Sequence, residues 1–253
     1  MYLYIYDTFL NNKKFAGILN RIENRLTDLE IKGKIYRLNI LKNMKEMVEE
    51  GIKQGVKTIV VVGDDQTFSK MINIIVDLNI TLGLIPVSNK SKIAQILGVP
   101  PAENACDILA QRLIKKIDLG KINQQYFIDS AIITHSPVTL EFNKYKITPL
   151  FKDSLISICN LGLLTSSPQI YRNISNPTDG LLEVVVEQTK GGLLNKLKKT
   201  AQQSIFSFKK VRINSEGGPA TITIDQQAIF KTPVEVSIAP QKLNVIVGSK
   251  RQF

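Results

Sequence analysis

The sequence predicts an α/β protein with two domains: an N-terminal domain built on a doubly wound, mostly parallel sheet, and a β-rich, antiparallel C-terminal domain. Two observations support this prediction. Strand-like and helix-like segments alternate through residues 1–113, the order that builds a parallel sheet with helices on its faces. From residue 114 onward, short strands follow one another with little helix between them. We therefore expect domains at residues 1–113 and 114–253, with a ligand cleft between them.

Hydrophobic periodicity places the elements of the first domain. Apolar residues three and four positions apart indicate helices, whereas short apolar or β-branched runs indicate strands. The predicted strands are Tyr2–Tyr6, Ile35–Leu38, Thr58–Val62 and Thr81–Ile85. The predicted helices are Phe15–Leu29, Met44–Ile52, Thr67–Val76, Ile93–Leu97 and Ala105–Leu113.

Runs of β-branched and aromatic residues place the elements of the second domain. One segment there, Leu193–Gln203, has strong helical periodicity. The predicted strands are Tyr126–Ile133, Val138–Phe142, Leu155–Cys159, Leu181–Val186, Lys210–Ile213, Thr221–Ile224, Ala228–Phe230, Val234–Ile238 and Leu243–Val247.

The composition is that of an ordinary globular protein, with 43% hydrophobic and 22% charged residues. No apolar run reaches the roughly 18 residues that a membrane span requires, and the first residues lack the pattern of a signal peptide. We therefore expect a cytoplasmic protein in which Cys106 and Cys159 are buried, reduced thiols. The single histidine, His135, offers neither a metal cluster nor a Ser-His-Asp triad, so it is interpreted as an ordinary strand residue.

The net charge of +11 favours anionic partners, namely nucleic acid, anionic lipid or a phosphorylated substrate. Nucleic acid is not expected, because no nucleic-acid-binding motif accompanies the charge. Part of the charge lies in the predicted helix Leu193–Gln203, where Lys196, Lys198 and Lys199 flank a leucine-lined face. Such a basic, weakly amphipathic helix either makes peripheral contact with an anionic membrane or packs its leucines on the β-rich domain.

Two loops stand out because each follows a predicted parallel strand, at Gly63 and at Pro86. Ligands in open α/β sheets bind beyond the carboxyl ends of the strands. The first loop lies in "VVVGDDQTFSKMIN", where a valine-rich strand passes through Gly63 and two aspartates into a helix. A strand that ends in glycine and leads into a helix is a common place to hold a phosphate. The sequence therefore indicates a ligand site at these two loops.

Four stretches carry a resemblance that spans nearly the whole chain. The loop "GDDQT", Gly63–Thr67, stands where a known family has Gly-Gly-Asp-Gly-Thr, and Asn73 follows on the next helix. The stretch "PVSNKSKIAQILGVP" parallels Pro-Leu-Gly-Thr-Gly-Asn-Asp-Phe-Ala-Arg-x-Leu-Gly-Ile-Pro, and "NPTDGLLEVVV" parallels an Asp-Asp-Gly-x-Leu-Asp segment. Asp225–Gln227 stands at an Asp-Gly-Glu turn. The sequence thus resembles the diacylglycerol kinase catalytic-domain family of soluble lipid kinases and, more distantly, the NAD kinases.

The resemblance implies ATP-dependent phosphoryl transfer to a lipid hydroxyl, with ATP and Mg²⁺ as cofactors, and it is compatible with a homodimer. It also implies a base, either Asp65 or the residue at position 227, where Gln227 replaces the family's glutamate. The implied metal ligands are Asp65, Asp179 and Glu183. The implied nucleotide-binding residues are Gly63, Asp64, Gln66, Thr67, Ser88, Asn89 and Lys90.

Several residues at the expected nucleotide-binding and catalytic positions differ from the family pattern. Asp64 and Gln66 replace loop glycines, and a carboxylate about 4 Å from a phosphate repels it by about 4 kcal/mol at an effective dielectric near 20. Mg²⁺ bridging Asp64 or Asp65 to the phosphate would reverse that sign. Gln227 cannot accept a proton, and loss of a general base typically lowers a rate by about 10² to 10⁴. Gln226 replaces the turn glycine, so a different hairpin geometry is expected.

Each of these residues also has a structural interpretation. Asp65 is suited to capping the helix that begins near Thr67. Asp179–Gly180 has the composition of a plain turn, and Ser88–Ser91 that of a surface loop. Three functions therefore stay open: a lipid kinase, a non-catalytic relative that binds nucleotide or lipid as a sensor or scaffold, and, less favoured, a kinase for a soluble substrate such as NAD.

Overall fold

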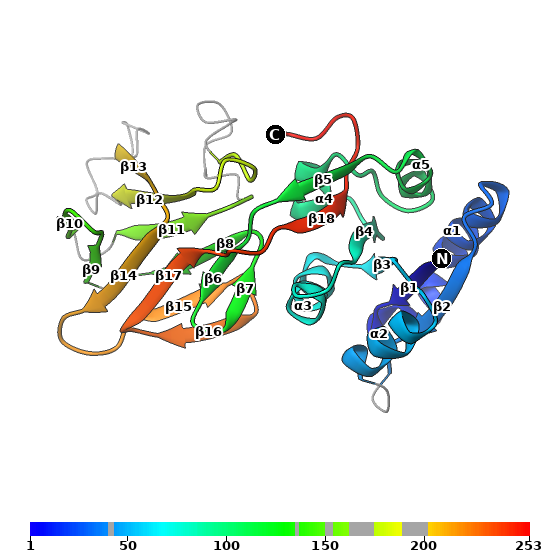
Figure 1. Cartoon of the computed structure of the whole chain (residues 1–253), viewed down its shortest axis with the longest axis horizontal. Helices are drawn as coiled ribbons and strands as arrows, with labels where there is room; N and C mark the ends of the chain where they lie inside the picture. The colour runs from blue at the N-terminus through cyan, green and yellow to red at the C-terminus, as the bar shows by residue number, and fades with distance from the viewer. Residues whose placement is uncertain (40–42, 135–136, 150–153, 162–174, 189–201) are drawn as a thin grey trace. The chain divides into compact units, whose positions relative to one another are not determined.

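The computed structural model describes residues 1–39, 43–134, 137–149, 154–161, 175–188 and 202–253, and these form two compact units (Figure 1). Unit 1 comprises Met1–Ile117 and Gln241–Phe253, and unit 2 comprises Asp118–Pro240. The predicted fold class is confirmed, because unit 1 carries a mostly parallel sheet and unit 2 carries antiparallel sheets. The last residues, which the sequence pattern placed with the β-rich part, lie in unit 1 because their strand joins its sheet.

The sheet of unit 1 has the order β2-β1-β3-β4-β18-β5 among the described residues. Its pairs are parallel except for the pair of β18 with β5, which is antiparallel. All residues of β3 and β4 are buried, as expected for strands covered on both faces. The strands are β1 Tyr2–Tyr6, β2 Gly33–Arg37, β3 Thr58–Gly63, β4 Thr81–Pro86, β5 Ile114–Ile117 and β18 Leu243–Ile246.

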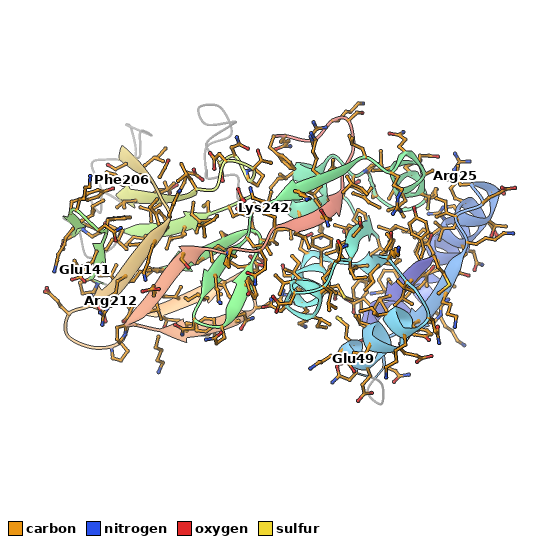
Figure 2. The ribbon with its side chains drawn as sticks, viewed as in Figure 1. Arg25, Glu49, Glu141, Phe206, Arg212 and Lys242 are labelled. Atoms are coloured by element: carbon orange, nitrogen blue, oxygen red, sulfur yellow. The ribbon has the colours of Figure 1, made fainter. Side chains whose placement is uncertain are left out.

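Helices cover both faces of this sheet. β2 lies on one side of β1 in the sheet, whereas β3 and β4 lie on the other side. Because the connections between parallel strands are right-handed, the β1–β2 connection places α1 on one face, and the β2–β3 and β3–β4 connections place α2 and α3 on the opposite face. Contacts of α1 with α5, and of α2 with α3, agree with that arrangement. Glu49 points outward from α2, whereas the Arg25 guanidinium on α1 pairs with Asp107 of the neighbouring α5 (Figure 2). The helices are α1 Ala16–Asp28, α2 Met44–Lys53, α3 Asp65–Ile75, α4 Lys92–Leu97 and α5 Asn104–Gln111, with 3₁₀ turns η1 Thr8–Asn11 and η2 Lys13–Phe15.

Unit 2 is a sandwich of two antiparallel sheets, ordered β10-β9-β14-β17-β6-β7 and β13-β12-β11-β8-β15-β16 in the part of the chain that is described. Apolar residues from both sheets form one shared core. On the first sheet, Arg212 of β14 lies opposite Glu141 of β9 (Figure 2). The strands are β6 Gly120–Ile122, β7 Gln125–Phe127, β8 Ser130–Ile133, β9 Val138–Glu141, β10 Lys146–Ile147, β11 Leu155–Cys159, β12 Leu182–Gln188, β13 Gln202–Phe208, β14 Lys210–Ser215, β15 Thr221–Ile224, β16 Ala228–Lys231 and β17 Val234–Ile238.

Some predicted elements differ from the observed ones. The predicted strand Tyr126–Ile133 is two strands, β7 and β8, and the short strands β5 and β6 were not predicted because lysines interrupt their apolar pattern. Most of the predicted helix Leu193–Gln203 lies outside the described residues, but Gln202 and Gln203 belong to β13, where they pair with β12. His135 also lies outside the described residues.

Two further predictions concern single residues and helix length. Cys106 and Cys159 are buried thiols that are not joined in a disulfide, as predicted. Burial raises the pKa of the Cys106 thiol to about 12. Of the helices in the described ranges, none combines the length and the hydropathy of a membrane span.

Candidate functional site

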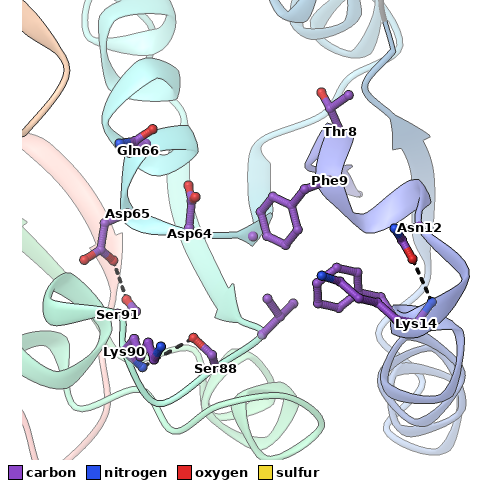
Figure 3. Close-up of a pocket in the computed structure, with 13 residues that line it drawn as sticks. Thr8, Phe9, Asn12, Lys14, Asp64, Asp65, Gln66, Ser88, Lys90 and Ser91 are labelled. Atoms are coloured by element: carbon purple, nitrogen blue, oxygen red, sulfur yellow. Dashed lines mark hydrogen bonds between the residues drawn. The ribbon is translucent and has the colours of Figure 1, made fainter.

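A cavity of about 860 Å³ lies at the carboxyl ends of β1, β3 and β4 in unit 1 (Figure 3). This volume is within the range of small-molecule sites. Three loops line it: the segment between β1 and α1, the β3–α3 loop and the β4–α4 loop. The described lining residues are Thr8, Phe9, Asn12, Lys14, Phe15, Gly63, Asp64, Asp65, Gln66, Val87, Ser88, Lys90 and Ser91.

Most of the nucleotide-binding residues named from the sequence meet at this cavity. Gly63, Asp64, Gln66, Ser88 and Lys90 are among its lining residues, and so is Asp65. Two named residues are not among the described lining residues. Thr67 is 5% exposed and its hydroxyl donates a hydrogen bond to Asp7. The backbone carbonyl of Asn89 accepts a hydrogen bond from the Gln95 side chain at 2.7 Å.

The two loop aspartates have different structural partners. Asp64 is the N-cap of α3, because its Oδ1 accepts a hydrogen bond from the backbone N–H of Thr67 at 3.0 Å. Asp65 does not cap this helix. Its Oδ2 accepts from the backbone N–H of Lys92 at 2.8 Å and of Ile93 at 3.3 Å, and its Oδ1 accepts from the Ser91 hydroxyl. Asp65 therefore binds the N-terminus of α4, the next helix along the chain (Figure 3).

Ser91 completes this arrangement and was not named as a site residue from the sequence. It is the N-cap of α4: its Oγ accepts from the Ala94 N–H at 3.0 Å, and its carbonyl accepts from the Gln95 N–H at 3.3 Å. Lys92, Ile93, Ala94 and Gln95 thus all donate their backbone N–H groups to protein oxygens. The serine two residues after Asn89, just before an apolar run, was the available signal, since serine is a preferred N-cap.

Asp7 is a third carboxylate beside these loops and was not predicted as a site residue. It follows β1, accepts the Thr67 hydroxyl and accepts the Phe9 N–H at 3.4 Å. A Cβ added at Gly63 would lie 3.0 Å from the Asp7 Cβ, so glycine permits the close approach of these two strand ends. Its position directly after a parallel strand was the signal that could have identified it.

The segment between β1 and α1 is closed by its own hydrogen bonds. The N–H groups of Leu10, Asn12 and Phe15 donate to the carbonyls of Asp7, Phe9 and Asn12. The Lys14 N–H donates to Asn12 Oδ1 at 3.0 Å. These backbone donors are therefore used inside the segment, and the segment meets the cavity with side chains.

An aromatic pair forms one wall of the cavity. The rings of Phe9 and Phe15 meet edge to face, with centroids 5.3 Å apart and an interplanar angle of 65°. The Lys14 ammonium lies 4.9 Å from the centroid of the Phe15 ring. Phe9 and Lys14 lie on one side of the cavity, opposite Ser88, Lys90 and Ser91 (Figure 3). Both phenylalanine rings are only partly buried, unlike the core residue Phe68.

The predicted metal ligands Asp179 and Glu183 belong to unit 2. Asp179 is exposed and forms a turn, because its Oδ1 accepts from the Leu181 N–H at 2.9 Å. Glu183 lies on β12 and is 3% exposed. Burial raises the pKa of Glu183 above its ordinary value, and the neighbouring Asp179 raises it further. Within the described residues, no three His, Cys, Asp or Glu side chains gather as a metal site.

Gln227 is the last residue of the tight turn between β15 and β16 in unit 2. Its N–H donates to the Ile224 carbonyl at 2.9 Å, and the preceding residues Asp225 and Gln226 have φ of 46° and 57°. Gln226 therefore adopts the left-handed conformation that glycine would favour. The Asp225 carboxylate accepts backbone hydrogen bonds from Ile128, Asp129 and Ser130, which ties this turn to the β7–β8 connection.

The predicted membrane-contact residues Lys196, Lys198 and Lys199 lie outside the described residues.

The fold and the cavity define an α/β protein of the class that binds ligands at the strand ends of a doubly wound sheet. The family comparison is more specific: residues 2–122 match the model of the diacylglycerol kinase catalytic domain. The resemblance found in the sequence is thereby confirmed. A curated diacylglycerol kinase from Bacillus subtilis (strain 168) is 35% identical over 77 residues, which is 29% of this chain and 25% of that protein. The match spans about a quarter of the relative's length.

Solved structures confirm the fold along the whole chain. A diacylglycerol kinase from Bacillus anthracis strain Sterne has a TM-score of 0.78 and 19% identity, covering 99% of this chain and 97% of that one. A second structure from the same organism has a TM-score of 0.77 and 17% identity, covering 98% and 97%. At such identities the likeness concerns the fold.

Proposed function

We propose that this chain is a non-catalytic relative of the diacylglycerol kinases that binds a nucleotide in the unit 1 cavity. The observation that carries the proposal is the set of hydrogen bonds made by Asp65. Its Oδ1 accepts from Ser91 and its Oδ2 accepts from the N–H groups of Lys92 and Ile93, so most of the acceptor capacity of this carboxylate is already used at the start of α4 and it is poorly placed to act as base or metal ligand. Gln227, at the family's other base position, carries an amide that does not titrate.

The cavity fits a nucleotide better than it fits an ATP–Mg²⁺ complex. Its volume and its aromatic wall suit a base, and Lys14 and Lys90 supply positive charge. Mg²⁺ prefers several oxygen ligands, and it would neutralise phosphate charge if bound. Asp64 is the lining carboxylate best suited to it, since its Oδ2 makes no hydrogen bond within the described residues. One such oxygen is a weak basis for a metal site.

A second candidate, an active lipid kinase, is favoured by one observation. Asp64 faces the same cavity as Ser88 and Lys90, so a carboxylate is present where phosphates would be bound. In that case Asp64 would hold Mg²⁺ and the lipid would bind in unit 2. Peripheral attachment to an anionic membrane through the basic segment, a homodimer and a cytoplasmic location are parts of the same proposal.

Asp64→Asn separates the two candidates, because asparagine is also a good N-cap and the change removes only the charge. A non-catalytic site that binds nucleotide without a metal should bind it about 10-fold more tightly in the variant, since a phosphate-repelling charge is gone. A kinase that holds Mg²⁺ through Asp64 should instead lose both nucleotide affinity and turnover. Calorimetric titration in the presence and absence of Mg²⁺ measures the binding, and the exposed Asp77→Asn is the matched control.

Catalysis is measured directly with γ-labelled ATP, Mg²⁺ and mixed micelles of diacylglycerol, sphingosine or ceramide. We expect no labelled lipid from the wild type. We also expect none from Gln227→Glu, because a restored carboxylate does not free Asp65 from α4. Labelled lipid from the wild type that disappears in Asp64→Asn would establish the kinase. A rise in turnover on Gln227→Glu would show that position 227 does serve as the base.

A further inference from the structure

We propose that the cavity binds a nucleoside monophosphate. Contacts with the base supply most of the affinity, and the cavity favours a single phosphate over a di- or triphosphate. The base lies against Phe9 and Phe15, and the phosphate pairs with Lys14 and Lys90. This inference rests on the proposed nucleotide-binding function and specifies which part of the ligand supplies the affinity. Three features of unit 1 carry it: the aromatic wall, the protein carboxylates bound at the helix N-termini and the balance of charge.

The aromatic wall provides a stacking surface that the core does not need. Phe9 and Phe15 are in contact with each other and line the cavity, and both keep part of their surface exposed. The turns that carry them are fixed by the caps of Asp7 and Asn12. A preorganised ring beside a cavity favours a flat aromatic ligand, because stacking a base on an aromatic side chain is favourable for every base.

The N-terminus of α4 at the cavity is already occupied, and that of α3 is occupied at Thr67. Such ends bind phosphates through unused backbone N–H groups. At α4 the Asp65 carboxylate takes the N–H groups of Lys92 and Ile93, and Ser91 takes those of Ala94 and Gln95. At α3 the Asp64 carboxylate takes the N–H of Thr67. Two protein carboxylates thus stand where phosphate oxygens would be bound.

The balance of charge at the cavity also disfavours a long phosphate chain. Among the described lining residues, Lys14 and Lys90 are the cations, and Asp64 and Asp65 are the anions. One phosphate can be paired with the lysines on the sides of the cavity. Each further phosphate adds negative charge near the two aspartates without adding a cation, so affinity should fall from monophosphate to triphosphate when no metal is present.

The test is a calorimetric titration of the full chain, without Mg²⁺, with AMP, GMP, CMP, UMP, ADP, ATP, adenosine and inorganic tripolyphosphate. We expect at least one monophosphate to bind more tightly than its triphosphate, and tripolyphosphate not to bind. Phe9→Leu keeps an apolar side chain and removes the ring, so it should weaken monophosphate binding about 5- to 100-fold. Phe9→Trp should retain or improve binding, which separates loss of stacking from loss of folding.

Matched controls define the site. Tyr145→Leu removes a 48% exposed aromatic residue of unit 2 and should leave binding unchanged. Lys14→Ala should weaken monophosphate binding about 5-fold but adenosine binding little, whereas Lys13→Ala, a change at the neighbouring exposed lysine that is not among the lining residues, should alter neither.

The outcomes distinguish this inference from the function on which it rests. Triphosphate binding that exceeds monophosphate binding, or binding that persists in Phe9→Leu with unchanged affinity, would overturn the base-led mode and leave nucleotide binding intact. Absence of binding by every nucleotide would overturn the proposed function itself. Binding of tripolyphosphate alone would show that the phosphate chain, rather than the base, is recognised.

Discussion

The Asp65 carboxylate accepts a hydrogen bond from the backbone N–H of Lys92 at 2.8 Å, which joins the first turn of α3 to the first turn of α4. The same carboxylate also accepts from Ile93 and Ser91. Asp65, named from the sequence as a base or metal ligand, therefore joins the β3–α3 and β4–α4 loops of the cavity. Charge-assisted hydrogen bonds of this type are stronger than neutral ones, so the bond contributes to stability as well as to the shape of the site.

Replacing Asp65 should consequently destabilise the chain. Asp65→Ala removes the acceptor for the N–H groups of Lys92 and Ile93 and should lower the free energy of unfolding by about 2 kcal/mol. Asp65→Asn keeps one acceptor oxygen and should lower it by about half as much. Urea unfolding followed by circular dichroism measures both values.

Asp77→Asn, at an exposed carboxylate of the same unit, is the control and should change stability by less than about 0.5 kcal/mol. If Asp65→Ala were as stable as the wild type, the Asp65 carboxylate would not be bound to α4 in solution, and the case for a non-catalytic site would lose its main support.

A second carboxylate with a structural role is Asp225, which accepts backbone N–H groups from Ile128, Asp129 and Ser130. Asp225→Ala should lower the free energy of unfolding by about 2–4 kcal/mol, because buried donors would be left without an acceptor. Asp225→Asn should have a smaller effect, since asparagine tolerates the positive φ of this position and retains one oxygen. If the alanine and asparagine variants were equally stable, the hydrogen bonds accepted by Asp225 would not determine the stability of this turn.

The fold could be predicted from the sequence because its elements have clear periodicity. The alternation through β1, β3 and β4 with α1 and α3 indicates a parallel sheet, and the valine-rich β3 is buried along its length. The loops after β3 and β4 meet at one cavity because carboxyl ends of neighbouring parallel strands share an edge of the sheet. Periodicity also predicts where such a cavity should lie.

The hydrogen bonds of the site could not be predicted in the same way. Asp65 and Lys92 are far apart in the sequence, and no local pattern shows that an aspartate on one helix binds the start of another. The 3₁₀ turn that carries Phe9 lacks helical periodicity, and Phe15 was assigned to the predicted helix Phe15–Leu29 although it lies in the second 3₁₀ turn, so the aromatic wall was missed. The return of β18 to the first sheet is a long-range pairing that local propensity does not reveal.

Gln226 offers a prediction about backbone conformation. Its φ of 57° is unfavourable for an L-residue with a Cβ and is acceptable for glycine. Gln226→Gly should raise the free energy of unfolding by about 0.5–1 kcal/mol, the gain being reduced by the greater flexibility of glycine in the unfolded chain. Gln226→Ala should give no such gain, because alanine has the same conformational cost. Thermal unfolding of the two variants and the wild type measures these differences in stability. If Gln226→Ala were stabilised as much as Gln226→Gly, the gain would come from removing the glutamine side chain rather than from the backbone conformation.

Glu183 offers a prediction about pH. Burial raises its pKa above the ordinary value of 4.5, so the folded chain binds the proton more tightly than the unfolded chain. The contribution of this group to stability is therefore complete below the ordinary pKa and is lost as the pH rises through the folded-state pKa. Glu183→Gln carries no charge at any pH. We expect the variant to be more stable than the wild type at pH 7 and the difference to vanish as the pH falls toward 4.

Unfolding in urea from pH 4 to pH 8 measures this difference, and Glu216→Gln, at an exposed site of unit 2, is the control that should show none.

The same variants test the metal prediction for Asp179 and Glu183. If these carboxylates bind Mg²⁺, millimolar Mg²⁺ at pH 7 should raise the melting temperature of the wild type but not that of Glu183→Gln, since a ligand bound only by the folded state stabilises it. If Mg²⁺ has no effect and Glu183→Gln is stabilising at pH 7, Glu183 is a buried, proton-binding carboxyl rather than a metal ligand. A destabilised Glu183→Gln without a Mg²⁺ effect would contradict both interpretations.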